Sequence, residues 1–255
     1  MIARPPFTPL IDDTGGLQAT LDGYRLLLDD RLYLYTYLRS VVLAATATLL
    51  CLLLGYPMAL VIARAPDRLR SILLLLIIVP FWISFLLRVY AWIGLLNNRG
   101  IINNFLLWTG FIEKPLQLLY TDFAIYVGIV YSYLPFMILP LYATLERLDH
   151  DLVEAAADLG ARPWHAFRDI TWPMSRPGVI AGCLLVFIPA MGEYVIPYLL
   201  GGADSLMIGR VLYDEFFLNR DWPLASAAAI VLLLLLVVPI VMLQRYQLRQ
   251  DEYQS

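Results

Sequence analysis

The segment LDHDLVEAAADLGARPWHAFRDITWPMSRPG, residues 148–178, contains more charged residues than any other segment between two apolar parts of the chain. Its pattern predicts two short helices joined by a glycine. Asp149 or Asp151 is a candidate N-cap of the first helix, because a side-chain oxygen there accepts hydrogen bonds from free backbone N–H groups. Apolar residues follow at helical spacing, at Leu152, Ala155, Ala156 and Leu159. Gly160 is then expected to end this helix in the left-handed conformation.

The second helix of the segment is predicted to begin at Pro163, whose missing N–H has no cost in a first helical turn. Apolar side chains follow three residues apart, at Trp164, Phe167 and Ile170, which places them on one face. Pro173 is expected to close the unit, since proline interrupts a helix interior. The segment therefore predicts a polar pair of helices with one apolar face.

Five apolar stretches accompany this segment, and each is long enough to cross a bilayer as a helix, which needs about 20 residues. They are residues 41–63, 71–96, 123–145, 179–203 and 223–243. The composition agrees, because the 255 residues are 60% hydrophobic and 15% charged, whereas soluble domains have about 25% charged residues. A soluble fold would have too little polar chain to cover five such helices. We therefore predict an all-α, polytopic transmembrane helix bundle with five visible spans.

The polar segments define the expected domain organisation. Residues 1–40 are predicted to be an external amino-terminal segment with an amphipathic stretch. Residues 41–243 form the transmembrane domain, which contains the loop 146–178, and residues 244–255 form a tail. Lys and Arg are denser in the link 64–70, in the loop and in the tail than in the other polar segments. Because such residues favour the cytoplasmic side, the carboxyl terminus is predicted to be cytoplasmic.

Two charged residues, Arg88 and Glu193, lie inside predicted spans. Intramembrane charges are costly and usually face a cavity or a partner. In straight helices with a rise of 1.5 Å per residue, both fall in the outer half of the membrane, about 20–26 Å from its inner end, where they can meet. One interpretation is a structural ion pair. The other is that Glu193 lines a cation path, in which Tyr194, Tyr198 and Trp92 offer ring faces to an amine.

The sequence contains no pattern typical of catalysis. It has no Walker-type glycine loop, no metal-ligand cluster and no nucleophile arrangement, and it has only two histidines. We therefore expect no enzymatic activity, no bound cofactor and no catalytic or metal-binding residue. The net charge of −3 offers no broad basic surface to nucleic acid. Membrane lipid is the expected environment of the apolar helices.

Three features of the charged loop resemble the cytoplasmic EAA loop of permease subunits of binding-protein-dependent ABC importers. These are Glu154-Ala155-Ala156, Gly160, and Ile170 followed by Pro173. Further stretches resemble the spermidine/putrescine importer permeases, among them PFWISFLLRVYAWIGLL at residues 80–96 and VFIPAMGEYVIPYLLGG at residues 186–202. The resemblance implies the fold of type I (MetI-like) ABC importer permeases.

The resemblance also implies the function and the partners. The chain would be a subunit in the inner membrane of a bacterium that translocates polyamines. A second permease would pair with it as a heterodimer, two ATPase subunits would bind ATP and Mg, and an external binding protein would deliver the cargo. The implied ATPase-coupling residues are Glu154, Ala155, Ala156, Gly160, Arg162, Trp164, Phe167, Ile170 and Pro173. The apolar face would pack on the ATPase, whose closure would tilt the adjoining spans and open the path past Glu193.

Two features depart from the family pattern and leave alternatives open. The family ordinarily has six spans where five are visible here, and Tyr198 stands where several members have an acidic residue. Permeases of this fold also carry phosphonates, opines and other amines, so a different cargo is an alternative. A secondary transporter without an ATPase is a further alternative. It predicts inverted repeats and midmembrane ion-coupling residues, which the sequence does not show.

Overall fold

The computed structural model describes residues 24, 27, 29–202 and 205–252, and every regular element within them is helical. The predicted all-α class is confirmed. The chain divides into two compact units, one formed by residues 41–205 and the other by residues 1–40 with 206–255. Most of the predicted external segment, residues 1–40, lies outside the described residues.

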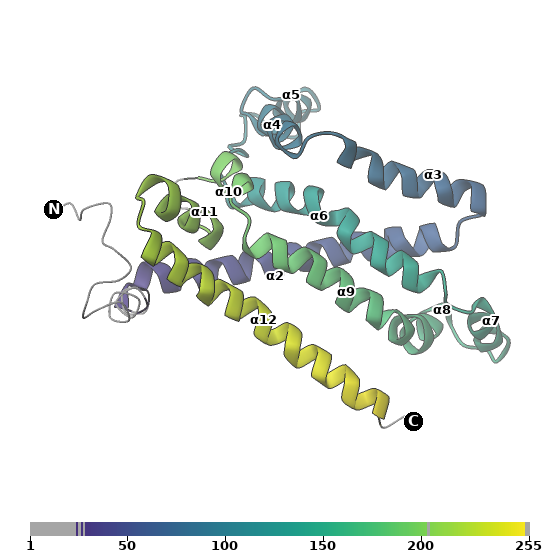
Figure 1. Cartoon of the computed structure of the whole chain (residues 1–255). Coiled ribbons are helices and arrows are strands. Elements are labelled where there is room, and N and C mark those ends of the chain that lie inside the picture. The colour runs from purple at the N-terminus through teal and green to yellow at the C-terminus, as the bar shows by residue number, and fades with distance from the viewer. Residues whose placement is uncertain (1–23, 25–26, 28, 203–204, 253–255) are drawn as a thin grey trace. The chain divides into compact units, whose positions relative to one another are not determined.

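Two antiparallel helices form the centre of the larger unit. α6 (Asp122–Leu145) and α9 (Trp172–Met191) lie side by side (Figure 1). Residues 41–63 of α2 (Arg31–Ala63) complete the apolar core, in which Tyr56 packs with residues of α6 and α9. These helices are apolar on most faces, so the position of an apolar face does not determine how they meet. Close packing of side chains determines which faces are in contact.

A glycine sets the close approach of α6 and α9. A Cβ atom added at Gly178 would lie 2.8 Å from the carbonyl oxygen of Pro140, which is backbone and cannot rotate away. Small residues at such positions allow transmembrane helices to pack closely. Gly178 is therefore required at this contact because it has no side chain.

Gly178→Ala is expected to lower the free energy of unfolding by about 1–3 kcal/mol, since overpacking forces the helices apart. The measurement is the thermal unfolding midpoint of the variant in lipid nanodiscs. Gly94→Ala is the matched control, because a Cβ there meets no atom within 4 Å. Equal midpoints for the two variants would contradict this account of the helix contact.

The apolar stretch 71–96 is not the straight helix expected from its hydropathy. α3 (Asp67–Ile78) runs into a 3-10 turn, η1 (Val79–Trp82), and α4 (Phe85–Leu96) follows. The helix pair bends by 92° at this break. Pro80 lacks a backbone donor, and Ile83 and Ser84 adopt extended backbone, so the helix ends and restarts in a new direction. The depth inferred for Arg88 from a straight helix is therefore wrong.

The stretch 179–203 is also broken, and the helix on its amino-terminal side is longer than expected. A helical run extends over Pro163–Met191, made of α8 (Pro163–Ala166), the π-helix η2 (Phe167–Thr171) and α9. The prediction that Pro173 closes the loop is wrong. Pro173 lies at the second residue of α9, in a first helical turn, where a missing N–H is tolerated. The run ends near Gly192, and the short helix α10 (Val195–Leu200) follows.

The smaller unit joins residues 31–40 of α2 to three carboxyl-terminal helices. These are α11 (Ile208–Tyr213), the π-helix η3 (Asp214–Leu218) and α12 (Trp222–Glu252). The Tyr33 hydroxyl donates to Glu215 Oε1 at 2.9 Å, and the Tyr37 hydroxyl donates to the Ala228 carbonyl at 2.5 Å. These bonds hold the amino-terminal end of α2 in this unit.

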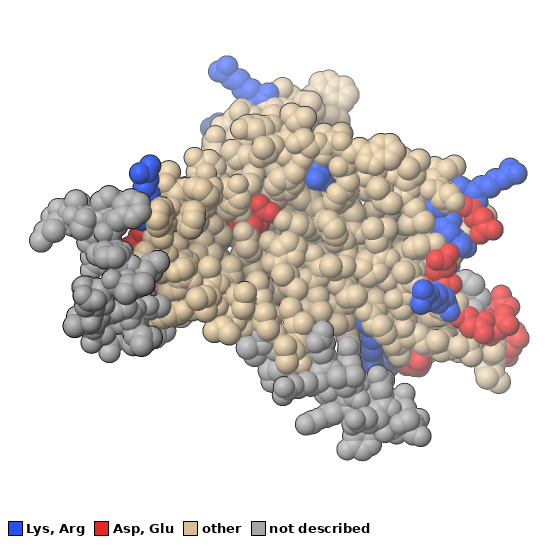
Figure 2. Space-filling view, viewed as in Figure 1, with Lys and Arg blue, Asp and Glu red and all other residues tan. Residues whose placement is uncertain are grey.

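Among the described residues, 3 helices are long and apolar enough to cross a membrane, or 4 with the bent pair counted as one span. The 3 single helices are Arg31–Ala63, Asp122–Leu145 and Pro163–Met191, and α12 adds a shorter apolar part, Trp222–Val237. On the face drawn in Figure 2, charged side chains of the larger unit gather at the end that holds α7 and α8, while its middle is almost free of charge. This distribution fits a bilayer around the middle of that unit.

Candidate functional site

The first helix of the charged loop forms as predicted. α7 spans His150–Asp158, and Asp149 is its N-cap. The Asp149 Oδ1 atom accepts a hydrogen bond from the Asp151 backbone N–H at 3.1 Å. This bond satisfies one of the backbone N–H donors that are free at the start of a helix. The beginning of α7 is therefore determined by residues that are close in the sequence.

Gly160 ends α7 in the left-handed conformation, with φ +83°. The Gly160 N–H donates to the Ala157 carbonyl at 2.9 Å, and the Ala161 N–H donates to the Ala156 carbonyl at 2.9 Å. This pair of bonds is the Schellman arrangement, which strongly favours glycine at the residue with positive φ. The predicted helix end is confirmed, and it fixes the direction in which α8 leaves α7.

The loop presents large apolar side chains to the outside. Leu159 is 90% exposed, Trp164 is 67% exposed and Leu152 is 45% exposed. We call these three residues the loop surface. The neighbouring Glu154 and Ala155 are exposed as well, while Ala156 is half-buried. Exposed apolar side chains among charged residues are typical of a protein interface.

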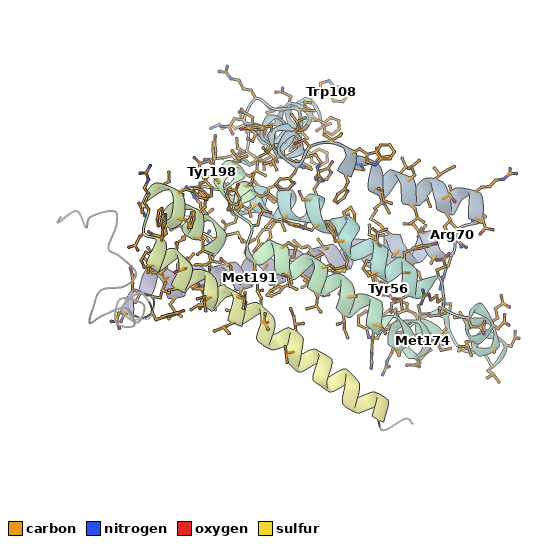
Figure 3. The ribbon with its side chains drawn as sticks, viewed as in Figure 1. Tyr56, Arg70, Trp108, Met174, Met191 and Tyr198 are labelled. Atoms are coloured by element: carbon orange, nitrogen blue, oxygen red, sulfur yellow. The ribbon has the colours of Figure 1, made fainter. Side chains whose placement is uncertain are left out.

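The predicted apolar face is not exposed as a whole. Trp164 stacks on Phe167 with ring centroids 5.6 Å apart, and Phe167 continues inward to Tyr56, at 5.7 Å in an edge-to-face contact. Figure 3 shows Tyr56 beside the end of α9 that adjoins α8. Phe167 is half-buried in the core of its own chain, because the π-helix turns its ring toward α2. Only Trp164 of this pair lies on the loop surface.

The remaining loop residues have mixed environments. Arg162 is exposed at the extended position before α8, and Arg168 forms an exposed ion pair with Asp169 at 3.7 Å. Ile170 and Pro173 are half-buried on the helical run that leads into the membrane. An exposed ion pair contributes little to stability. The loop is therefore held by its caps and by apolar contacts.

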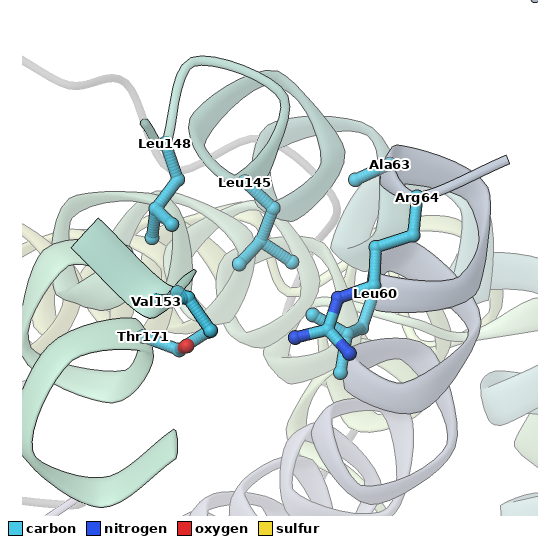
Figure 4. Close-up of a pocket in the computed structure, with 7 residues that line it drawn as sticks. All are labelled: Leu60, Ala63, Arg64, Leu145, Leu148, Val153 and Thr171. Atoms are coloured by element: carbon cyan, nitrogen blue, oxygen red, sulfur yellow. The ribbon is translucent and has the colours of Figure 1, made fainter. Parts of the chain in front are cut away.

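The loop is packed against the ends of two spans. A cavity of about 10 Å³ is lined by residues from α2, α6, α7 and η2 and from the turns beside them (Figure 4). Its lining residues are Leu60, Ala63, Arg64, Leu145, Leu148, Val153 and Thr171. A space of this size holds about one water molecule. The base of the loop and the ends of α2 and α6 thus meet around one small cavity.

Glu193 is the centre of the intramembrane site. Its side chain is 8% exposed, and its Oε2 accepts a hydrogen bond from the Tyr133 hydroxyl at 2.5 Å. Its Oε1 accepts from the backbone N–H groups of Val195 and Ile196, at 3.0 and 3.4 Å. The carboxylate therefore caps the first turn of α10, where the helix dipole also favours a negative charge.

Arg88 is not paired with Glu193 in the described residues. The described part of the chain has no hydrogen bond or ion pair between them, which makes the structural ion pair interpretation wrong for this structure. The Arg88 Cζ atom lies 4.8 Å from the ring centroid of Phe81 and 5.7 Å from that of Phe85. The side chain is 8% exposed, and its Nε and Nη1 donors have no hydrogen-bond partner in the described residues. Two aromatic faces stabilise this cation in place of a carboxylate.

The three aromatic candidates differ in exposure. Tyr194 is 40% exposed and Tyr198 is 54% exposed. Trp92 is half-buried and packs on Tyr131, with ring centroids 5.4 Å apart. Tyr133, the partner of Glu193, was not among the residues predicted from the sequence. A tyrosine inside an apolar span needs a partner for its hydroxyl, which is the signal that points to it.

Glu193→Ala and Arg88→Met are expected to have different effects on stability, although each removes a charge from the membrane domain. Glu193→Ala removes the cap of α10 and leaves the Tyr133 hydroxyl unpaired, so unfolding becomes easier by about 2 kcal/mol or more. Arg88→Met removes unpaired buried donors and is expected to be neutral or stabilising. Thermal unfolding in nanodiscs measures both. Equal losses for the two variants would instead indicate an ion pair.

Comparisons with known proteins identify the family. Residues 52–249 match the model of the binding-protein-dependent transport system inner membrane component. The chain is 48% identical over 208 residues to the spermidine/putrescine transport system permease protein PotB of Escherichia coli, covering 82% of this chain and 75% of that protein. Three quarters of the relative and most of this chain are thus included. The loop and both candidate sites lie within residues 52–249, which match the family model.

Solved structures agree on the fold. A bacterial ABC transporter that imports the acidic polysaccharide alginate has a TM-score of 0.66 at 20% identity, over 92% of this chain and 86% of that chain. The alginate transporter in complex with its pentasaccharide-bound periplasmic protein has a TM-score of 0.64 at 19% identity, over 87% and 80% of the two chains. The expected importer permease fold is confirmed. The chain belongs to the family of binding-protein-dependent transport system inner membrane components.

Proposed function

We propose that this chain is the permease subunit through which polyamines cross the inner membrane in a binding-protein-dependent ABC importer. The observation that supports polyamines as the cargo is the 48% identity to the spermidine/putrescine permease over 82% of the chain. The residues that match the family model, 52–249, include the buried carboxylate Glu193 and the exposed rings of Tyr194 and Tyr198. Carboxylates and aromatic faces are the groups that bind flexible organic cations.

ATP hydrolysis by a separate pair of ATPase subunits, which hold ATP and Mg, drives this transport. The loop surface of Leu152, Leu159 and Trp164 is the proposed contact, because these apolar side chains are exposed beside charged residues. The helical run Pro163–Met191 supports the coupling, since it joins the loop to a span through continuous helical structure. A push on α8 is therefore transmitted into α9.

Two further partners complete the proposed assembly. A second, related permease forms the other half of the path, and an external binding protein delivers the cargo. The external binding protein is supported by the alginate transporter of the same fold, which was solved in complex with its substrate-bound periplasmic protein. The loop and the carboxyl terminus then lie on the cytoplasmic side, in agreement with the distribution of Lys and Arg.

The proposed cargo path runs past the exposed rings of Tyr194 and Tyr198, with Trp92 on α4, which contacts α10. Both oxygens of Glu193 are engaged in this structure, by Tyr133 and by the first turn of α10. Glu193 therefore attracts a cation through its charge, and it binds an ammonium group directly only when the start of α10 moves. Alternating access supplies such a movement.

The test of this function is a ligand panel. The complete complex is reconstituted with its binding protein, and ATP hydrolysis is measured with spermidine, putrescine, a phosphonate and an opine. We expect stimulation by the two polyamines alone. If neither polyamine stimulates ATP hydrolysis and another ligand does, the proposed cargo is wrong and that ligand is the better candidate. Uptake driven by an ion gradient without ATP would show that the protein is a secondary transporter.

A further inference from the structure

The loop and the membrane domain meet at a π-helix. η2 (Phe167–Thr171) interrupts the α-helical run, and the Trp172 N–H bonds to the Phe167 carbonyl five residues earlier. Single π turns within α-helices are rare and occur frequently at functional sites. A π turn is also a natural point of bending, because it returns to regular α-helix by a shift of hydrogen-bond partners. A contact that restrains this turn is therefore needed if a movement of the loop is to displace α9.

One side chain from a different helix contacts both ends of the π turn. The ring of Tyr56, on α2, makes an edge-to-face contact with Phe167 at 5.7 Å and a tilted contact with Trp172 at 5.7 Å. Phe167 is the first residue of η2, and Trp172 is the first residue after it. Tyr56 is 8% exposed. Its ring thus bridges the bendable segment from outside.

A polar contact fixes the same side chain. The Tyr56 hydroxyl and Ser175 Oγ are 2.9 Å apart, and Ser175 Oγ donates to the Trp172 carbonyl at 3.0 Å. Ser175 is fully buried. Because a buried hydroxyl without a partner is costly, this pair resists separation. The first turn of α9 is therefore tied to α2 through Tyr56.

The contacts also reach the loop surface. Trp164, which is 67% exposed, stacks on Phe167, and Phe167 contacts Tyr56. A row of three rings thus leads from the surface of the loop to the core of the membrane domain. A partner that displaces Trp164 acts on Tyr56 through direct packing contacts.

We propose that Tyr56 is a positioning residue that clamps the π turn, so that the coupling loop, α9 and α2 move as one body when the ATPase closes. This inference rests on the proposed function and adds a residue outside the loop to its coupling mechanism. With the clamp weakened, the π turn absorbs the movement of the loop. ATP is then hydrolysed without a matching displacement of the spans.

A purely structural role for Tyr56 makes a different prediction. Loss of a structural contact reduces the amount of assembled complex, and it lowers transport and ATP hydrolysis together. Loss of the clamp lowers the number of cargo molecules transported per ATP hydrolysed by the complexes that do assemble. This ratio is therefore the measurement that separates the two roles.

The test compares Tyr56→Phe, Ser175→Ala and the double variant with the wild-type complex in proteoliposomes. Each single variant removes the same hydroxyl pair, and we expect the transport-to-hydrolysis ratio to fall about two- to tenfold in each. The double variant should fall no further, because both changes break one interaction. Tyr37→Phe is the control, since it removes a buried hydroxyl bond of α2 to Ala228, in the other unit. Its ratio should equal that of the wild type.

The possible failures are distinct. If the wild-type complex shows no polyamine-stimulated ATP hydrolysis, the proposed function is wrong, and the coupling role of Tyr56 is wrong with it. If the wild type couples while Tyr56→Phe and Ser175→Ala keep the wild-type ratio, the clamp is wrong and the proposed function stands. An equal fall in Tyr37→Phe would also overturn the clamp, because it would show a general effect of lost buried bonds.

Discussion

Gly160→Val is expected to weaken binding of the ATPase to the permease complex by about 5- to 150-fold. A β-branched residue at φ +83° carries about 1–3 kcal/mol of backbone strain. The chain relieves that strain by leaving the left-handed conformation, which breaks the two bonds that end α7 and redirects α8. Titration of purified ATPase onto permease complexes in nanodiscs gives the dissociation constant.

Gly110→Val is the matched control for this variant. Gly110 also has a positive φ, of +73°, and an added Cβ meets no atom within 4 Å at either glycine. Gly110 precedes α6 and Gly160 follows it, so a helix on the order of 35 Å long separates the two turns. We expect normal ATPase binding by Gly110→Val. Normal binding by Gly160→Val as well would show that the loop geometry has no part in the contact.

Trp164→Ala is expected to weaken ATPase binding by about 30-fold or more. Large aromatic residues at the centre of an interface frequently contribute 2 kcal/mol or more on truncation. Trp164 has this character, because it is 67% exposed and its ring is held in place by stacking on Phe167. The same nanodisc titration measures the loss. Trp164→Phe retains a stacked ring and should recover most of the affinity.

Trp108→Ala provides the comparison, since Trp108 is also a large exposed ring, at 83%. It lies in α5 (Ile101–Trp108), far from the loop along the larger unit (Figure 3). We expect unchanged ATPase binding. A similar loss in both tryptophan variants would indicate a general effect of aromatic truncation on the complex and would contradict a contact at Trp164.

The local structure of the loop was predictable because short-range chemistry determines it. The cap at Asp149 and the helix end at Gly160 depend on residues within a few positions of each other. Tertiary packing has little influence on such motifs. The apolar helices were likewise evident, since hydropathy alone indicates chain that belongs in a bilayer.

The shape of the spans was not predictable from hydropathy. A run of apolar residues indicates membrane chain, but it does not say whether the helix is straight, as the 92° bend between α3 and α4 shows. Pro80 was visible in the sequence, but most prolines within spans are tolerated without a break of this size. The bend changes the position expected for Arg88, so the lack of an ion pair with Glu193 in the described residues required the structure.

The partners of the site residues depended on long-range packing. Glu193 and its partner Tyr133 are 60 residues apart, and the sequence offered Arg88 as the more obvious partner because of its opposite charge. Phe167 has helical spacing with Trp164, but the π turn directs its ring to Tyr56. Periodicity assumes a regular helix, and it failed where the helix is irregular.

The most direct test of the central claim is a photo-crosslink from the loop surface in intact membranes. A photoreactive amino acid replaces Leu159, which is 90% exposed, or Phe111, which is 83% exposed and precedes α6. We expect an ATPase adduct from position 159 and none from position 111. Absence of an ATPase adduct at position 159, in complexes that still contain the ATPase, would contradict the assignment of this loop as the coupling surface.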